Sequence, residues 1–163
     1  MTQHSNVFPL DLASRRSTPA NQARSTVLKH LTEADWRAIL EAGELLNFVH
    51  GEIIVREGQK NDSLFFIDDG QVRVMRGDHA KAIELARLDG GSVFGEMSIL
   101  DGATASASII AESLEVDVVR IDRTELDRLM AANPDLGLRF YRSIAETLSS
   151  RLRDTNKIVR ILQ

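Results

Sequence analysis

Short apolar runs, separated by polar turns, fill the middle of the chain, where eight of the ten glycines fall between Gly51 and Gly102. Runs of this length bounded by turn residues are typical of β-strands. The runs are Leu45–Val49, Ile53–Arg56, Leu64–Asp68, Val72–Met75, Ile83–Leu88, Ser92–Phe94, Ser106–Ala111 and Leu114–Ile121. Short strands in this number over residues 44–121 predict a mainly β domain, either a barrel or a sandwich.

Two polar segments within this region predict tight turns. Asp68-Asp69-Gly70-Gln71 predicts a hairpin between the runs on either side of it, and Gly77–Ala80 predicts a second turn. Asp68 and Asp69 also form an acid pair, but adjacent strand residues point to opposite faces of a sheet. We therefore interpret the pair as part of a turn and not as a catalytic site.

Apolar residues at helical spacing precede the strand region. Thr32 is a good N-cap, Asp35 occupies the third helical position, and Gly43 ends the segment. These signals predict a short amphipathic helix over residues 33–42. Its apolar face carries Trp36, Ile39 and Leu40.

Two helices are expected after the strands. The first starts at Asp122 or Thr124 and ends near Asn133, and Pro134 at the next N1 position begins a long helix over residues 134–161. The long helix carries a seam at spacings of three and four, with Arg151 and Thr155 as polar interruptions. The seam residues are Tyr141, Ile144, Leu148, Arg151, Thr155, Ile158 and Leu162.

This seam predicts a partner for the long helix. Its N-terminal half can pack on the β domain, whereas the half after Arg151 extends past it and still carries Ile158 and Leu162. An exposed apolar stripe needs a cover, and the simplest one is the same helix of a second chain about a twofold axis. We therefore expect a homodimer formed through the C-terminal helix.

Residues 1–26 are polar, and they are rich in Ser, Thr, Asn, Gln and Arg. A segment of this composition cannot bury enough apolar surface to fold, so we expect a disordered tail. The folded domain is expected to cover residues 27–163, including the long helix.

Composition narrows the class of protein further. The net charge of −4 gives no general attraction to nucleic acid or anionic membranes, and no apolar run approaches the roughly 20 residues of a membrane span. Without cysteine, neither a thiolate metal site nor a thiol nucleophile is available. The N-terminus lacks the apolar core of a signal peptide. We expect a cytoplasmic protein of one domain that does not contact a membrane.

The sequence contains no recognisable catalytic set. The histidines, His4, His30, His50 and His79, are scattered over the tail, a loop and the turns. Nothing in the sequence places a carboxylate or a nucleophile beside any of them, and no metal-ligand spacing occurs. The sequence therefore predicts a non-enzymatic protein without a metal site.

The stretch from Val93 to Ile109 carries the most specific chemistry. Gly95 permits a tight turn after the Val93-Phe94 strand, Glu96–Leu100 is long enough for one short helical turn, and Asp101-Gly102 stops it. A helical turn between strands directs free backbone N–H groups to one point, which suits a phosphate. Glu96 beside it can accept hydrogen bonds from sugar hydroxyls.

This stretch resembles the phosphate-binding cassette of cyclic-nucleotide-binding domains, the module of catabolite activator protein and of protein kinase A regulatory subunits. The matching residues are Phe94, Gly95, Glu96, Ser98, Gly102, Ser106, Ala107 and Ser108. The resemblance implies an eight-stranded, jelly-roll-like β-roll with a short N-terminal and a long C-terminal helix. It implies a site for cyclic AMP or cyclic GMP, and it places Arg151 near the lid over the ligand. The implied site residues are Phe94, Gly95, Glu96, Met97, Ser98, Ala105, Ser106 and Ala107.

One cassette position departs from the family pattern. Ala105 stands where the family has the arginine that pairs with the cyclic phosphate. Arg73, Arg76 or Arg87, from neighbouring strands, could supply that charge instead. Two interpretations remain open: a stand-alone sensor that binds a nucleotide-like ligand and signals to a protein partner, or a ligandless interaction or dimerisation module. The helix-turn-helix of the family's transcription factors has no room before Gln163, so we expect no direct DNA binding.

Overall fold

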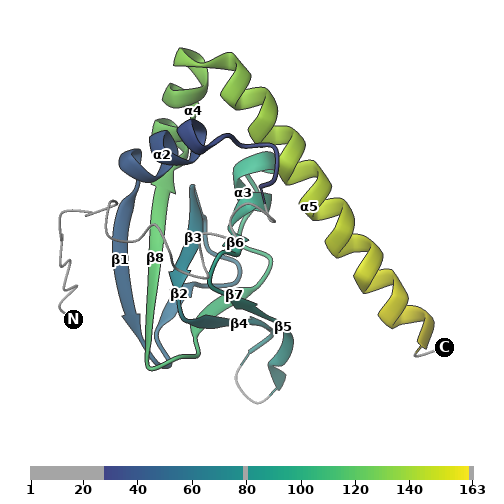
Figure 1. Cartoon of the computed structure of the whole chain (residues 1–163). Coiled ribbons are helices and arrows are strands. Elements are labelled where there is room, and N and C mark those ends of the chain that lie inside the picture. The colour runs from purple at the N-terminus through teal and green to yellow at the C-terminus, as the bar shows by residue number, and fades with distance from the viewer. Residues whose placement is uncertain (1–27, 79–80, 162–163) are drawn as a thin grey trace.

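The computed structural model describes residues 28–78 and 81–161, with side chains as far as Asn156. In this part of the chain the strands form two four-stranded antiparallel sheets, ordered β1-β8-β3-β6 and β2-β7-β4-β5 (Figure 1). The strands are β1 (Glu44–Val49), β2 (Ile53–Val55), β3 (Ser63–Asp69), β4 (Gln71–Arg76), β5 (Ile83–Asp89), β6 (Val93–Phe94), β7 (Ser108–Ala111) and β8 (Glu115–Asp122). The predicted eight-stranded β-roll is confirmed.

The alternation of side chains along β3 divides the interior into two cores. Leu64 and Phe66 point into a core between the first sheet and the helices, which also contains Ile39 and Phe140. Phe65 and Ile67 point the opposite way, into a core between the two sheets. Because β3 is buried on both faces from Leu64 to Ile67, its sequence there is apolar without interruption.

The hairpin predicted at Asp68–Gln71 is wrong. A turn does lie there, but β3 pairs with β6 and β8, while β4 pairs with β5 and β7, so the chain passes from one sheet to the other. Gly70 permits this crossing with φ +88°, at a point where a Cβ would lie 2.7 Å from the Glu115 carbonyl oxygen. The second predicted turn begins at Gly77, within the true β4–β5 hairpin, and its residues 79–80 lie outside the described residues.

The predicted helices are present in the described part of the chain. They are α2 (Glu33–Ala42), α3 (Glu96–Asp101), α4 (Arg123–Ala132) and α5 (Pro134–Ile161). Thr32 caps α2 in a capping box: its hydroxyl accepts from the Asp35 N–H at 3.1 Å, and the Asp35 carboxylate accepts from the Thr32 N–H at 2.8 Å. None of these helices is long and apolar enough to cross a membrane.

The first half of α5 packs on the β-roll, and the rest extends away from it (Figure 1). Ile144 is fully buried, so its side chain is not free to meet a second chain, and Leu148 packs partly buried against the same core. Of the other predicted seam residues, Tyr141 is exposed, and the Thr155 hydroxyl donates back to the Arg151 carbonyl. The side chains of Ile158 and Leu162 lie outside the described residues.

A partly buried ion pair holds the start of α5 against α2. Arg139 donates from Nε and Nη2 to the two oxygens of Asp35, at 2.7 and 2.8 Å. Asp35 is only 2% exposed. The hydrogen bond from Arg139 is the largest cause that lowers the pKa of Asp35 from 3.8 to about 2. One carboxylate therefore caps α2 and holds α5 in place.

We expect Asp35→Asn to lower the free energy of unfolding at pH 7 by about 2–3 kcal/mol, because it removes a charge-assisted bidentate pair. The carboxylate has a lower pKa in the folded state, so its stabilisation is complete above pH 3.8 and is lost as the pH falls toward 2. Urea unfolding across that range measures both effects. Glu33→Gln, at an exposed position of the same helix, is the control and should change stability by less than about 0.5 kcal/mol. A pH-independent difference would contradict the expectation.

Candidate ligand-binding site

The predicted cassette residues surround one cavity of about 140 Å³. It lies between the cassette, the inner face of the second sheet and α5. All eight implied site residues line it: Phe94, Gly95, Glu96, Met97, Ser98, Ala105, Ser106 and Ala107. Arg151 lines it as well. Residues 94–107 and a residue of the last helix are therefore brought to one place, as the resemblance implied.

Four strand residues and Asn61, from the loop before β3, complete the cavity and were not predicted to do so. They are Val55, Asn61, Val74, Leu88 and Ile109. All except Asn61 are apolar, so this wall suits the uncharged part of a ligand. The alternation of side chains along β4, β5 and β7 indicates which residues point into the β-roll. It does not indicate which of these inward residues line the cavity.

Gly95 shapes the turn into the cassette. It has φ +84°, and a Cβ at this position would lie 2.7 Å from the Ser63 carbonyl oxygen. That oxygen accepts a hydrogen bond from the Asn61 side-chain amide at 2.7 Å, so it cannot retreat freely. Only glycine satisfies both the conformation and the close approach. The turn then leads directly into α3, which Gly102 ends by donating to the Ser98 carbonyl at 2.9 Å.

Glu96 is the buried charge of the site, with 5% of its surface exposed. Its Oε1 accepts from Arg151 Nη1, and Arg151 Nη2 donates to the Val93 carbonyl at 2.8 Å. A buried carboxylate is stable only with such a partner. Arg151 thus reaches from α5 across to both ends of the turn that carries Glu96.

The segment around Ala105 is held by backbone hydrogen bonds. The Ala105 N–H donates to the Gln59 carbonyl at 2.9 Å, and its carbonyl accepts from the Gly58 N–H at 2.8 Å. The Ser106 hydroxyl lies 3.9 Å from the Met97 sulfur. The side chain of residue 105 therefore contributes a methyl group and no charge to the cavity.

The structure places none of the three strand arginines at the cavity. Arg73 and Arg87 both pair with Glu112, and Arg87 also pairs with Glu84. Arg76 is exposed and does not line the cavity. The expectation that one of them replaces the missing charge is not supported, and among the described residues Arg151 is the one cation that lines the cavity.

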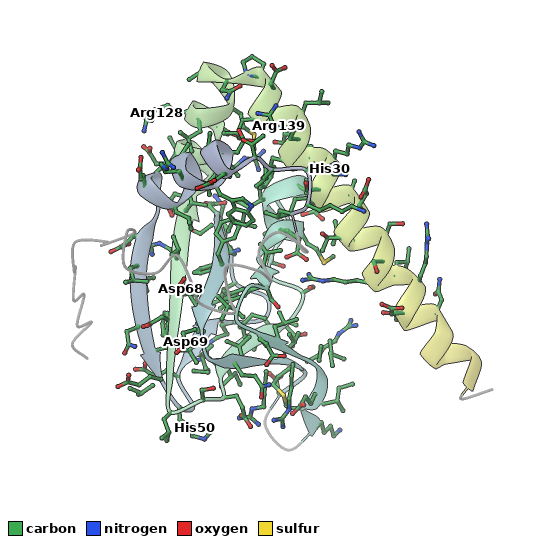
Figure 2. The ribbon with its side chains drawn as sticks, in the orientation of Figure 1. His30, His50, Asp68, Asp69, Arg128 and Arg139 are labelled. Carbon is green, nitrogen blue, oxygen red and sulfur yellow. The ribbon has the colours of Figure 1, made fainter. Side chains whose placement is uncertain are left out.

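The two described histidines lie far from each other (Figure 2), and neither lines the cavity. His30 contacts α5, where its Nε2 lies 2.9 Å from Glu146 Oε1, whereas His50 lies at the opposite end of the domain (Figure 2). His4 and His79 fall outside the described residues. In the described part of the chain no three His, Cys, Asp or Glu residues gather as a metal site would require.

The fold and this cavity define a ligand-binding β-roll, and comparison with known proteins identifies its family. Residues 45–133, more than half of the chain, match the model of the cyclic nucleotide-binding domain. The chain therefore belongs to the cyclic nucleotide-binding domain family, a family of binding and not of catalytic domains.

Individual relatives agree with this assignment. Cyclic GMP-binding protein C of Dictyostelium discoideum is 30% identical over 125 residues, which are 76% of this chain but only 5% of that protein. The crystal structure of a cyclic nucleotide-binding domain from Methylobacillus flagellatus has the same fold, with a TM-score of 0.75 at 24% identity over 88% of this chain and 86% of that one. Thermus thermophilus catabolite activator protein gives a TM-score of 0.70 at 26% identity, covering 83% of this chain and 62% of that one.

We expect Gly95→Ala to destabilise the domain more than Gly102→Ala. Both residues have positive φ, but a Cβ at Gly102 meets nothing within 4 Å, whereas one at Gly95 meets the Ser63 carbonyl at 2.7 Å. Gly102→Ala should therefore cost only the conformational penalty of about 1 kcal/mol, and Gly95→Ala about 2–3 kcal/mol. Urea unfolding of the two variants measures the difference. Equal losses would mean that the turn relaxes without strain.

Proposed function

We propose that the domain binds a cyclic nucleotide, cyclic AMP or cyclic GMP, in the cassette cavity and passes the state of the site to a partner through α5. The observation that carries this proposal is the buried Glu96 in the cavity, held by a residue of α5. Glu96 then accepts hydrogen bonds from the ribose hydroxyls. The phosphate lies beside Gly95, Met97 and Ser106, and the base lies against the apolar strand residues.

The names of the relatives support the ligand class. The Dictyostelium protein is named for binding cyclic GMP, and the family model describes cyclic nucleotide binding. The proposed activity is binding without catalysis. The chain spans only a small part of the curated relatives that it matches, so the partner that receives the signal is a proposal from this domain alone.

The size of the cavity supports a role for α5 in signalling. Ligand pockets commonly measure about 300–1,000 Å³. The present cavity of about 140 Å³ is smaller than that and is open on one side, so a nucleotide would extend beyond it or shift its walls. Arg151 is one of these walls and belongs to α5, so a ligand in the cavity also meets this helix. Ligand binding and helix position are thus coupled.

A second candidate function, dimerisation through α5, rests on a different observation. Leu138, Tyr141 and Leu152 are 70%, 44% and 62% exposed on this helix. They follow the three-and-four spacing of a coiled-coil seam, with exposed Ala145 and half-buried Leu148 between them. This stripe lies beside the seam expected from the sequence, whose Ile144 is buried in the domain. A second copy of α5 is the proposed cover.

For ligand binding, we expect the wild type to bind cyclic AMP or cyclic GMP with a Kd above about 1 μM, because Ala105 offers the phosphate no charge-assisted hydrogen bond. Ala105→Arg should tighten binding at least tenfold, since such a bond contributes roughly 1.5–3 kcal/mol. Calorimetric titration measures both. Ala103→Arg, at an exposed position of the same loop, is the control for nonspecific charge. Folded wild type and Ala105→Arg that both bind neither nucleotide would refute the proposed function.

For assembly, we expect the wild type to scatter light as a dimer, at twice the monomer mass of 18.1 kDa, at high micromolar concentration. Leu138→Asp with Leu152→Asp should return it to the monomer, because both side chains are exposed on α5. Leu85→Asp with Leu114→Asp adds the same charge at exposed positions of the β-roll and should leave the dimer intact. A monomeric wild type would exclude the dimer.

A further inference from the structure

We propose that Arg151 provides the positive charge for the ligand's phosphate, so that the charge which the cassette lacks at Ala105 comes from α5. This inference rests on the proposed function, because it assigns a partner to the phosphate of a cyclic nucleotide in the same cavity. It gives Arg151 a role beyond covering the site as a lid. This assignment also takes the place of the expectation that Arg73, Arg76 or Arg87 supplies the charge, because none of these three residues lines the cavity.

The charges of the cavity lead to this assignment. Among the described residues that line it, Glu96 and Arg151 alone are charged, and they pair with each other. A cyclic phosphodiester brings one further negative charge into the same small space. Without Arg151, two anions would share a cavity with no cation, which is strongly unfavourable away from water. With Arg151 between the two anions, its guanidinium contacts both the Glu96 carboxylate and the phosphate.

Arg151 has the donors for this double role. A guanidinium carries five N–H groups. Among the described residues, Arg151 uses one on Glu96 and one on the Val93 carbonyl, so it has donors left for phosphate oxygens. Its planar fork also suits phosphate geometry, which a lysine at this position would not match.

Arg151 is also better able to move than its partner. Its side chain is 37% exposed, whereas that of Glu96 is 6% exposed within the cassette. Leu148 is the last described residue of α5 that packs against the core, so Arg151 lies where the helix begins to leave the domain. A ligand can therefore draw Arg151 toward its phosphate while Glu96 stays in place for the ribose.

The test compares four proteins: wild type, Arg151→Gln, Ala105→Arg and the double variant. Each is titrated with cyclic AMP and with cyclic GMP by calorimetry, and thermal unfolding confirms that each is folded. We expect Arg151→Gln to weaken binding at least tenfold in the wild type, but less than about threefold once Ala105→Arg supplies the charge. Arg153→Gln, an exposed arginine on the same helix, should leave affinity unchanged within about twofold.

Two results would overturn the inference while the proposed function stands. In the first, Arg151→Gln binds as tightly as the wild type or more tightly, so that Arg151 is a bystander or competes with the ligand. In the second, the loss is equal in both backgrounds, which is the pattern of a lid over the base. A third result would overturn both: Ala105→Arg binds a nucleotide, but the wild type binds neither.

Binding by none of the four folded proteins would refute the proposed function and this inference with it. If Arg151→Gln fails to fold because Glu96 is left unpaired, the same comparison is made in a Glu96→Gln background. There the neutral amide needs no cation, and loss of Arg151 should still weaken binding at least tenfold. An unchanged affinity in that background would overturn the inference.

Discussion

The burial of β3 on both faces is the constraint on which the rest of the structure depends. Phe66 packs edge-on against Trp36 of α2, with ring centroids 5.4 Å apart, on the helix side of the sheet. Phe65 stacks on Phe94 at 4.9 Å between the sheets. Phe94 immediately precedes the cassette, so the packing of β3 fixes where the turn at Gly95 begins. The central residues Leu64–Ile67 tolerate neither a polar replacement nor a register shift, because either change would disturb both cores.

The cassette is therefore rigid on the strand side and adjustable on the helix side. Gly95 is confined by Ser63 and Asn61, and Glu96 is buried within the turn that follows. Arg151, in contrast, approaches from a helix whose contacts with the core end one turn earlier. In the proposed function, this difference separates two tasks: a fixed surface recognises the ligand, and a movable helix reports it.

The sequence predicted the parts that depend on local order and missed those that depend on distant contacts. The strands and the cassette were found because turn residues separate the apolar runs and because the cassette is nearly contiguous. The hairpin at Gly70 was predicted wrongly, because turn residues specify a bend but not the partner strand. The pairing of Arg151 with Glu96 joins residues 55 positions apart, and that of Arg139 with Asp35 joins residues 104 apart. Neither spacing could show which of several arginines meets the carboxylate. Ile144 of the predicted seam packs in the domain core, because the periodicity of a helix does not tell which of its neighbouring stripes faces the β-roll.

The Asp35–Arg139 pair makes α5 a lever with its pivot near the helix start. At a rise of about 1.5 Å per residue, Arg151 lies roughly 18 Å from the pivot, and the last described turn lies about 33 Å from it. A tilt of about 10° would then move the helix axis by about 3 Å at the cavity and by about 6 Å at the far end. A displacement of the helix axis at the cavity is thus about doubled at the part of α5 that extends beyond the β-roll, and the same tilt also moves Ile144 and Leu148 within the helix-side core.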